Sequence, residues 1–481
     1  MKNTDNTNNA TNTTTTTTTT NATNAINTTN TKKSKFVVII CVLIALAIIT
    51  TGYFVISGIV KNQPKIQFAF NKAVTVPPPV YPDAEFAVIS DLHLYDSALG
   101  MGGTAFEAVM MSDRKLLLDS VDLLEYAIDE IIKSEAQFVL ISGDLTKDGE
   151  LACHTLTANK LERLAQAGIN TYVIPGNHDV NNPEAESYSG DTATPVPNIS
   201  ADDFARIYAD FGYGNALKRD AGSLSYVTEP VDGLWLLALD ACRYGENKPG
   251  GEEIIGGKIN QATADWIAGV LAEAASLGKA VMAMSHHGIV EHWEGQSKLH
   301  PDYLVDEYER YGEFLASYDV RIVFTGHYHA QDITRADFGG KYIYDIETGS
   351  LITAPCPIRF LSLHGGELTV RSETAVDKLR PGLDFEREAT AFVKSTIKKE
   401  AFSTLKKYLV SNANADIIAD AVGDAFAAHY FGDENPALRP TLDESQLSLW
   451  GRIVLGTQKY VMDGLWRDLP PADNNAILPL P

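Results

Sequence analysis

The sequence predicts an α/β fold with a mainly parallel core, and two observations lead to this prediction. Short apolar runs alternate with amphipathic segments between Glu85 and Arg371, which is typical of strand–helix–strand units. Five of the apolar runs end directly at a small polar cluster, as strands of α/β sheets do at a ligand site. A hydrophobic content of 45% over 481 residues allows a large core and more than one domain.

The apolar runs that we interpret as strands are short and bounded by turn residues. They cover 85–90, 138–142, 171–174, 234–239, 280–284, 321–325, 342–346, 358–363 and 367–371. Between several of them, apolar residues recur at helical spacing. The helices expected there cover 114–133, 156–167, 263–276 and 303–317, and residues 94–113 are expected to form a loop.

The chain changes character after the last strand run. Residues 381–481 carry three amphipathic stretches, and their apolar residues recur at helical spacing. This pattern predicts a small C-terminal helical domain, which follows an α/β domain over 85–380.

The N-terminal 84 residues predict a tail, an anchor and a linker. Residues 1–35 are rich in Asn and Thr and are expected to be disordered. Residues 36–60 contain no charge and would span roughly 37 Å as a helix, enough to cross a membrane. Lys32, Lys33 and Lys35 precede this run, so the tail is expected in the cytoplasm and the remainder outside. A cleaved signal peptide is the alternative, and residues 61–84 are expected to form a proline-rich linker.

Charge and cysteine content exclude some classes of function. The formal net charge is -23, which disfavours binding of nucleic acid through a basic patch. The four cysteines have no metal-ligand spacing, so we expect free thiols rather than a zinc–thiolate site.

Five short blocks at strand ends carry the candidate chemistry. They are Asp91-Leu92-His93, Gly143-Asp144, Gly176-Asn177-His178-Asp179, Ser285-His286-His287-Gly288 and Gly326-His327-Tyr328-His329. Each block alone is a weak signal. Together they offer carboxylate, amide and imidazole ligands, which suit Mn, Fe or Zn, and enough of them for two adjacent ions. This inventory predicts metal-assisted hydrolysis of a phosphate ester.

The order of the blocks resembles the calcineurin-like metallophosphoesterase superfamily over residues 85–372. The Gly143-Asp144, Gly176–Asp179 and Gly326–His329 blocks are similar to its bacterial cyclic-nucleotide phosphodiesterase-like branch, some members of which have a helical C-terminal domain. The resemblance implies a four-layer α/β/β/α sandwich, here joined to a C-terminal helical domain and an N-terminal transmembrane helix.

The resemblance also implies a role for each site residue. One ion would be bound by Asp91, His93 and His329, the other by Asn177, His286 and His327, and Asp144 would bridge them. His178 would assist the leaving group while a metal-bridging hydroxide attacks phosphorus. His287 matches no ligand position, and the family's usual partner of the catalytic histidine is replaced by Lys147, with Asp148 next to it. Lys147 is also not the Tyr ligand of purple acid phosphatases, so no tyrosinate–iron chromophore is expected.

Phosphodiester hydrolysis of a small molecule is the favoured reaction. A phosphomonoesterase or protein phosphatase on the same site, and a non-catalytic scaffold on the same fold, are the alternatives. Because cyclic nucleotides act mainly in the cytoplasm, external nucleotides, glycerophosphodiesters and wall or lipid phosphates are comparably plausible substrates for an outward-facing site. His292 and His300, in a polar loop, are expected to be ordinary exposed histidines.

Overall fold

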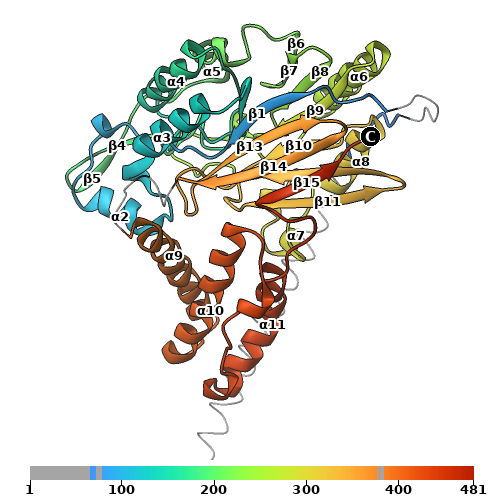
Figure 1. The fold of residues 1–481 in the computed structure, drawn as a ribbon. Helices are drawn as coiled ribbons and strands as arrows, with labels where there is room; N and C mark the ends of the chain where they lie inside the picture. The colour runs from blue at the N-terminus through green and yellow to red at the C-terminus, as the bar shows by residue number, and fades with distance from the viewer. Residues whose placement is uncertain (1–64, 72–77, 376–378, 380–383) are drawn as a thin grey trace, which may run out of the picture. The chain divides into compact units, whose positions relative to one another are not determined.

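The computed structural model describes residues 65–71, 78–375, 379 and 384–481 (Figure 1). The predicted tail at 1–35 and anchor at 36–60 lie outside these residues. In the described part of the chain, no helix is both long and apolar enough to cross a membrane. The chain divides into Met1–Ile66 and Gln67–Pro481, and the description below concerns the second unit.

The first sheet has six strands in the order β15-β14-β13-β1-β2-β3. Their bounds are β1 Ala84–Ile89, β2 Phe138–Ile141, β3 Asn170–Val173, β13 Pro357–His364, β14 Glu367–Thr374 and β15 Asn475–Pro479. β1, β2 and β3 are parallel, with Phe86 opposite Phe138, whereas β13, β14 and β15 add antiparallel strands. The parallel centre therefore places the carboxyl ends of three strands at one edge.

The second sheet has seven strands in the order β11-β12-β10-β9-β8-β7-β6. Their bounds are β6 Lys218–Arg219, β7 Tyr226–Val231, β8 Leu234–Leu239, β9 Ala280–Ser285, β10 Ile322–Thr325, β11 Asp332–Phe338 and β12 Lys341–Glu347. β8, β9, β10 and β12 are parallel, and the outer strands are antiparallel. Every residue of β8, β9 and β10 is buried, as expected for strands covered on both faces.

The two sheets pack against each other, and helices cover the outer faces beside their parallel strands (Figure 1), whereas β14 and β15 alternate buried and exposed residues. The Phe86 ring of β1 meets the Phe324 ring of β10 edge-on, with 5.6 Å between centroids. The helices beside the first sheet are α3 Ser120–Lys133 and α4 Leu151–Gln166, and those beside the second are α6 Gln261–Leu277 and α8 Tyr308–Ser317. The mixed α/β fold predicted from the alternation is confirmed.

Local sequence signals set the ends of these helices. α6 begins after Asn260, whose side chain accepts the Thr263 backbone N–H, and it ends at Gly278 in the left-handed conformation. The shorter elements are α2 Thr104–Ser112, α5 Ala201–Ile207, α7 Gln296–Leu299, β4 Glu186–Ser189 and β5 Thr192–Pro195. α2 lies in the segment expected to be a loop, so that expectation was wrong: its apolar residues gave no clear helical stripe, although Phe106 is buried.

Three helices follow strand β14 in the chain, as predicted. They are α9 Phe385–Lys407, α10 Asn412–Phe431 and α11 Leu449–Leu465, and α10 packs against both of the others. The chain then returns to the first sheet as β15, which pairs with β14. The end of α10 lies close to the second sheet at Gly432, where φ is 71° and an added Cβ would lie 2.3 Å from the Gln331 carbonyl oxygen. Only glycine fits this approach.

Candidate metal centre

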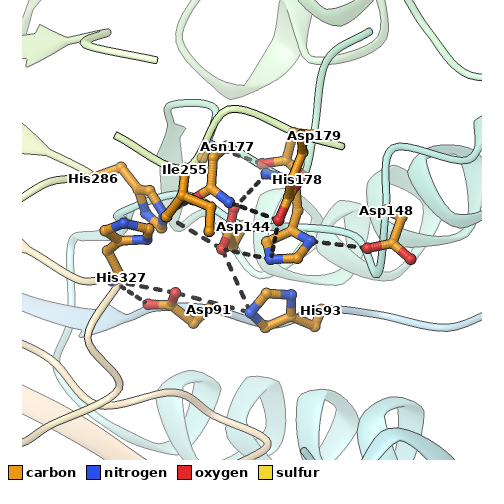
Figure 2. A network of polar contacts seen from close by, with 12 residues as sticks. Asp91, His93, Asp144, Asp148, Asn177, His178, Asp179, Ile255, His286 and His327 are labelled. Carbon is orange, nitrogen blue, oxygen red and sulfur yellow. Dashed lines mark hydrogen bonds and ion pairs between the residues drawn. The ribbon is translucent and has the colours of Figure 1, made fainter. Parts of the chain in front are cut away.

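All five polar blocks meet at one edge, where strands of both sheets end (Figure 2). β1 leads to Asp91 and His93, β2 to Asp144, β3 to Asn177 and His178, β9 to His286, and β10 to His327 and His329. The two sheets pack face to face, so their carboxyl ends supply opposite walls of a single site. The eight residues predicted from the sequence are therefore brought together.

One group of ligands consists of Asp91, His93 and His329, and all three are buried. The Nε2 atoms of His93 and His329 are 3.2 Å apart, and His329 Nε2 lies 3.4 Å from Asp91 Oδ1. The Ser90 hydroxyl donates to Asp91 Oδ2 at 2.5 Å, and the backbone N–H of His327 also donates to this carboxylate. These hydrogen bonds fix the orientation of the Asp91 carboxylate.

The second group consists of Asp144, His286 and His327, with Asn177 beside it. His286 Nε2 lies 3.3 Å from Asp144 Oδ2 and 3.2 Å from Asn177 Oδ1. The other ring nitrogen of His286, Nδ1, donates to the Ser142 carbonyl oxygen at 2.7 Å, which aims Nε2 at Asp144 and Asn177, where it could ligate an ion.

Asp144 lies between the two groups. Its Oδ2 atom is 3.5 Å from His93 Nε2, 3.3 Å from His286 Nε2 and 3.9 Å from His178 Nε2. Burial alone would raise the pKa of this carboxyl, but His286, His178 and His93 hold the pKa well below its usual range. Asp144 is therefore an anion placed to be shared between two ions.

The spacing of these donors fits bound metal ions. Ligands about 2.0–2.2 Å from one ion lie roughly 3–3.5 Å from each other, and most of the separations given above fall in or near this range. Burial lowers the pKa of His93 and of His327 well below the usual value, so both imidazoles are neutral and able to ligate. The donor set of imidazole, carboxylate and amide suits Mn, Fe or Zn.

The backbone of this site is strained. The φ angles of five site residues are positive, a region that non-glycine residues enter rarely. They are 51° at Asp91, 36° at His93, 50° at Asp144, 74° at His327 and 67° at His329. The sharp turns at the strand ends aim these side chains into one small volume, and the surrounding sheets hold them there.

The loops after β2 and β3 are joined by Asp179. Its carboxylate accepts the backbone N–H groups of Gly176, Leu145 and Thr146 at 2.8–3.0 Å. Gly176 approaches Asp144 so closely that an added Cβ would lie 2.0 Å from Asp144 Oδ1. Asp179 thus positions the two ligand loops instead of ligating.

His178 lies on the open side of the site, with 17% of its side chain exposed. Its Nδ1 is 2.9 Å from Asp148 Oδ1 (Figure 2). Its Nε2 is 3.4 Å from Glu253 Oε1. Burial would lower the pKa of His178, but Glu253, Asp144 and Asp148 raise it to about 10. Asp148 therefore takes the role of orienting partner that the sequence left in doubt at Lys147.

Two further residues were missed from the sequence. Glu253 lies in an irregular loop, accepts a hydrogen bond from Asn177 at 3.3 Å and another from Asn182 at 2.8 Å, and had no motif to mark it. Lys115 is partly buried beside the site, where Asp113, Asp148, Asp144 and Glu253 raise the pKa of its ammonium against the effect of burial. His287 lies in neither ligand group, and its Nε2 is 2.8 Å from the Ile255 carbonyl oxygen.

A cavity of about 370 Å³ lies next to the centre, between the α/β core and the C-terminal helices. Its lining is mostly apolar and includes Tyr303, Tyr328, Phe426 and Met462, with Arg114 as its cation. The ring of Tyr303 is 4.5 Å from that of His327, centroid to centroid, so the cavity adjoins the candidate metal ligands.

A family model described as calcineurin-like phosphoesterase matches residues 84–331. Similar solved structures include a dimetal phosphatase from Danio rerio, at 17% identity and a TM-score of 0.43, covering 62% of this chain and 96% of that one. A purple acid phosphatase from yellow lupin has 11% identity and a TM-score of 0.38, covering 63% and 53%. A 5'-nucleotidase precursor from Thermus thermophilus has 13% identity and a TM-score of 0.35, covering 66% and 59%. No curated protein matches the chain.

Proposed function

We infer that this chain, which belongs to the calcineurin-like phosphoesterase family, hydrolyses phosphodiesters at the centre built around Asp144. Family membership makes it a phosphoric ester hydrolase that uses two divalent metal ions. The finer assignment of residues to roles is our proposal. Its main support is the placement of Asp144 Oδ2 within 3.5 Å of imidazole nitrogens from both ligand groups.

We assign Asp91, His93 and His329 to one ion, Asn177, His286 and His327 to the other, and Asp144 to both. When bound, the two ions supply a hydroxide nucleophile near neutral pH and neutralise charge on the phosphoryl oxygens. Asp148 holds Nδ1 of His178, which leaves Nε2 facing the site. His178 Nε2 donates a proton to the departing ester oxygen, and Glu253 favours the protonated ring.

The preference for diesters rests on the cavity beside Tyr303. A diester carries a second organic group that stays on the phosphorus while the first group departs. The mostly apolar cavity of about 370 Å³ next to His327 provides space for that group. Glu253 also places negative charge near His178, whereas Asp148 is paired with Lys147. This charge disfavours a dianionic monoester more than a monoanionic diester.

The substrate test compares bis-p-nitrophenyl phosphate with p-nitrophenyl phosphate. We expect the larger kcat/KM for the diester, and a dominant monoester rate would exclude the diesterase assignment in favour of a phosphomonoesterase. A series of alkyl p-nitrophenyl phosphates then tests the cavity. Ala401→Phe, which narrows it, should slow hydrolysis of the longer alkyl esters selectively. Ser403→Phe, on the exposed face of the same helix, is the matched control.

We further propose that the enzyme is anchored by residues 36–60 and acts outside the cytoplasm. The support is the uncharged run that follows Lys32, Lys33 and Lys35. The candidate substrates are then cyclic nucleotides, which the branch that the motifs resemble hydrolyses, and also external nucleotides, glycerophosphodiesters and wall or lipid phosphates. Protease treatment of intact cells should digest the catalytic part, and its survival would contradict this orientation.

A further inference from the structure

A second cluster of buried acidic and imidazole groups lies where α10 meets the second sheet. Its members are Asp332 at the start of β11, His429 near the end of α10 and Glu434 just beyond α10. Each offers a ligand atom within 4.8 Å of those of the other two, and all three are buried. The cluster shares no residue with the catalytic centre.

The hydrogen bonds within this cluster leave several buried atoms unsatisfied. His429 Nδ1 lies 2.5 Å from Glu434 Oε1, and both side chains are 1% exposed. His429 Nε2 and Glu434 Oε2 have no hydrogen-bond partner among the described residues. A buried carboxylate oxygen without a partner is costly, so Glu434 Oε2 indicates a ligand on the side of the ring that carries His429 Nδ1.

The surroundings add two further groups to the cluster. His292 is fully buried, so the expectation of an exposed histidine was wrong. Its Nδ1 lies 2.6 Å from Asp332 Oδ1, and its Nε2 lies 3.4 Å from Glu347 Oε2. His292 Nε2 and Glu347 Oε1 are also buried atoms without a hydrogen bond in the described part of the chain.

Carboxyl groups outnumber basic side chains in this region. Besides Asp332, Glu347 and Glu434, the region contains a fourth acidic residue, Asp473, which is also buried. Arg359 is the nearby buried guanidinium, but it donates to the backbone carbonyls of Asp473, Glu347 and Asp332, not to their carboxylates. Burial, together with the neighbouring Asp332, raises the pKa of Glu347 to about 8 although His292 lowers it.

We propose that Asp332, His429 and Glu434 bind a further divalent cation, distinct from the catalytic pair, that fastens the end of α10 to the second sheet. Two carboxylates and one imidazole suit Zn²⁺ or Mn²⁺. His292 orients Asp332, as hydrogen-bonded partners of metal ligands usually do. The inference does not depend on which phosphate ester the enzyme cleaves.

The ion would also support the catalytic loop. The ring of Tyr328 packs 5.6 Å from that of His429, centroid to centroid, and Tyr328 lies between the candidate ligands His327 and His329. Gln331 N–H donates to the Tyr430 carbonyl oxygen at 3.3 Å. The loop that follows β10 is therefore held on one side by the segment that the ion would fasten.

Elemental analysis of the full chain, loaded with Zn²⁺ and then freed of excess metal, tests the proposal. Glu434→Gln and His429→Gln should each bind one equivalent of zinc fewer than the unmodified chain and melt at a lower temperature. Glu444→Gln, at an exposed position, is the control and should lose no zinc. An unchanged zinc content in both cluster variants would overturn the proposal.

A variant of the catalytic centre tests the proposed site independently, in case the Glu434 and His429 variants do not fold. Asp91→Ala combined with Asp144→Ala should empty the catalytic centre and still retain one equivalent of zinc. X-ray absorption of that protein should report oxygen ligands with a single imidazole, and Zn²⁺ should raise its melting temperature. A catalytic-centre variant that binds no zinc would refute the proposed site while leaving the phosphoesterase assignment intact.

Discussion

The catalytic centre and the cluster around His429 use the same residue types, but they differ in access. At the centre, His178 has 17% of its side chain exposed and a cavity adjoins the ligands, whereas the His429 side chain is 1% exposed. His178 therefore gives the first cluster an opening to solvent, whereas the His429 side chain is closed off from it. Access, more than ligand chemistry, therefore separates a site for a reaction from a site for stability.

The two clusters also differ in their distribution along the chain. The catalytic ligands follow strand ends in compact blocks, because parallel strands deliver their carboxyl ends to one edge. Asp332, His429 and Glu434 come from a strand, a helix and the turn after it. Four substitutions should therefore affect the two clusters differently, and the largest effect is expected at Asp144.

Asp144→Asn should have the largest effect on activity. It removes the carboxylate that lies between both ligand groups, so we expect a loss of about 10⁴-fold in kcat/KM and a loss of catalytic metal. Hydrolysis of bis-p-nitrophenyl phosphate and metal content measure both. Asp122→Asn, exposed on α3, should change neither. Near-normal activity in Asp144→Asn would contradict a shared bridging role.

His178→Ala should reduce kcat by about 10²–10³-fold for esters with poor leaving groups, because proton donation is lost. Both catalytic ions should remain bound, which distinguishes His178 from the ligands. The rate of hydrolysis of p-nitrophenyl esters should fall less, since that leaving group needs little protonation. His364→Ala, at a side chain that is 79% exposed, is the control. Equal losses for good and poor leaving groups would argue against a leaving-group role.

Asp148→Asn should cost about 10–100-fold in kcat, with a smaller change in KM, because Asp148 positions His178 without touching the substrate. The double variant with His178→Ala should be no slower than His178→Ala alone, since both act through one ring. Additive losses in the double variant would show that Asp148 has a separate function.

Gly432→Ala should affect the contact between the end of α10 and the second sheet, near the cluster around His429, and not the catalytic centre. The positive φ and the 2.3 Å approach to the Gln331 oxygen should lower the free energy of unfolding by about 1–3 kcal/mol. Urea unfolding measures this loss, and catalytic metal content should not change. Gly456→Ala, in open space on α11, should instead stabilise by about 0.5–1 kcal/mol. A loss of catalytic metal in Gly432→Ala would show that the two regions are coupled.

The sequence determined the α/β class and the C-terminal helices, and the eight candidate residues that it marked lie together at one edge of the fold. It could do so because strand–helix alternation is a local pattern and the ligands directly follow strand ends. The short edge strand β6 and the C-terminal strand β15 were not predicted from the sequence. Edge strands lack the continuous apolar runs of β8 and β9.

Only the tertiary structure decided which residues support the catalytic centre and what His292 does. Asp148 was visible as a neighbour of Lys147, but its contact with His178 depends on how two loops pack. Glu253 enters from an irregular loop, and the cluster around His429 joins positions about a hundred residues apart. Such contacts follow from the packing of distant segments, which no local pattern of apolar and polar residues specifies.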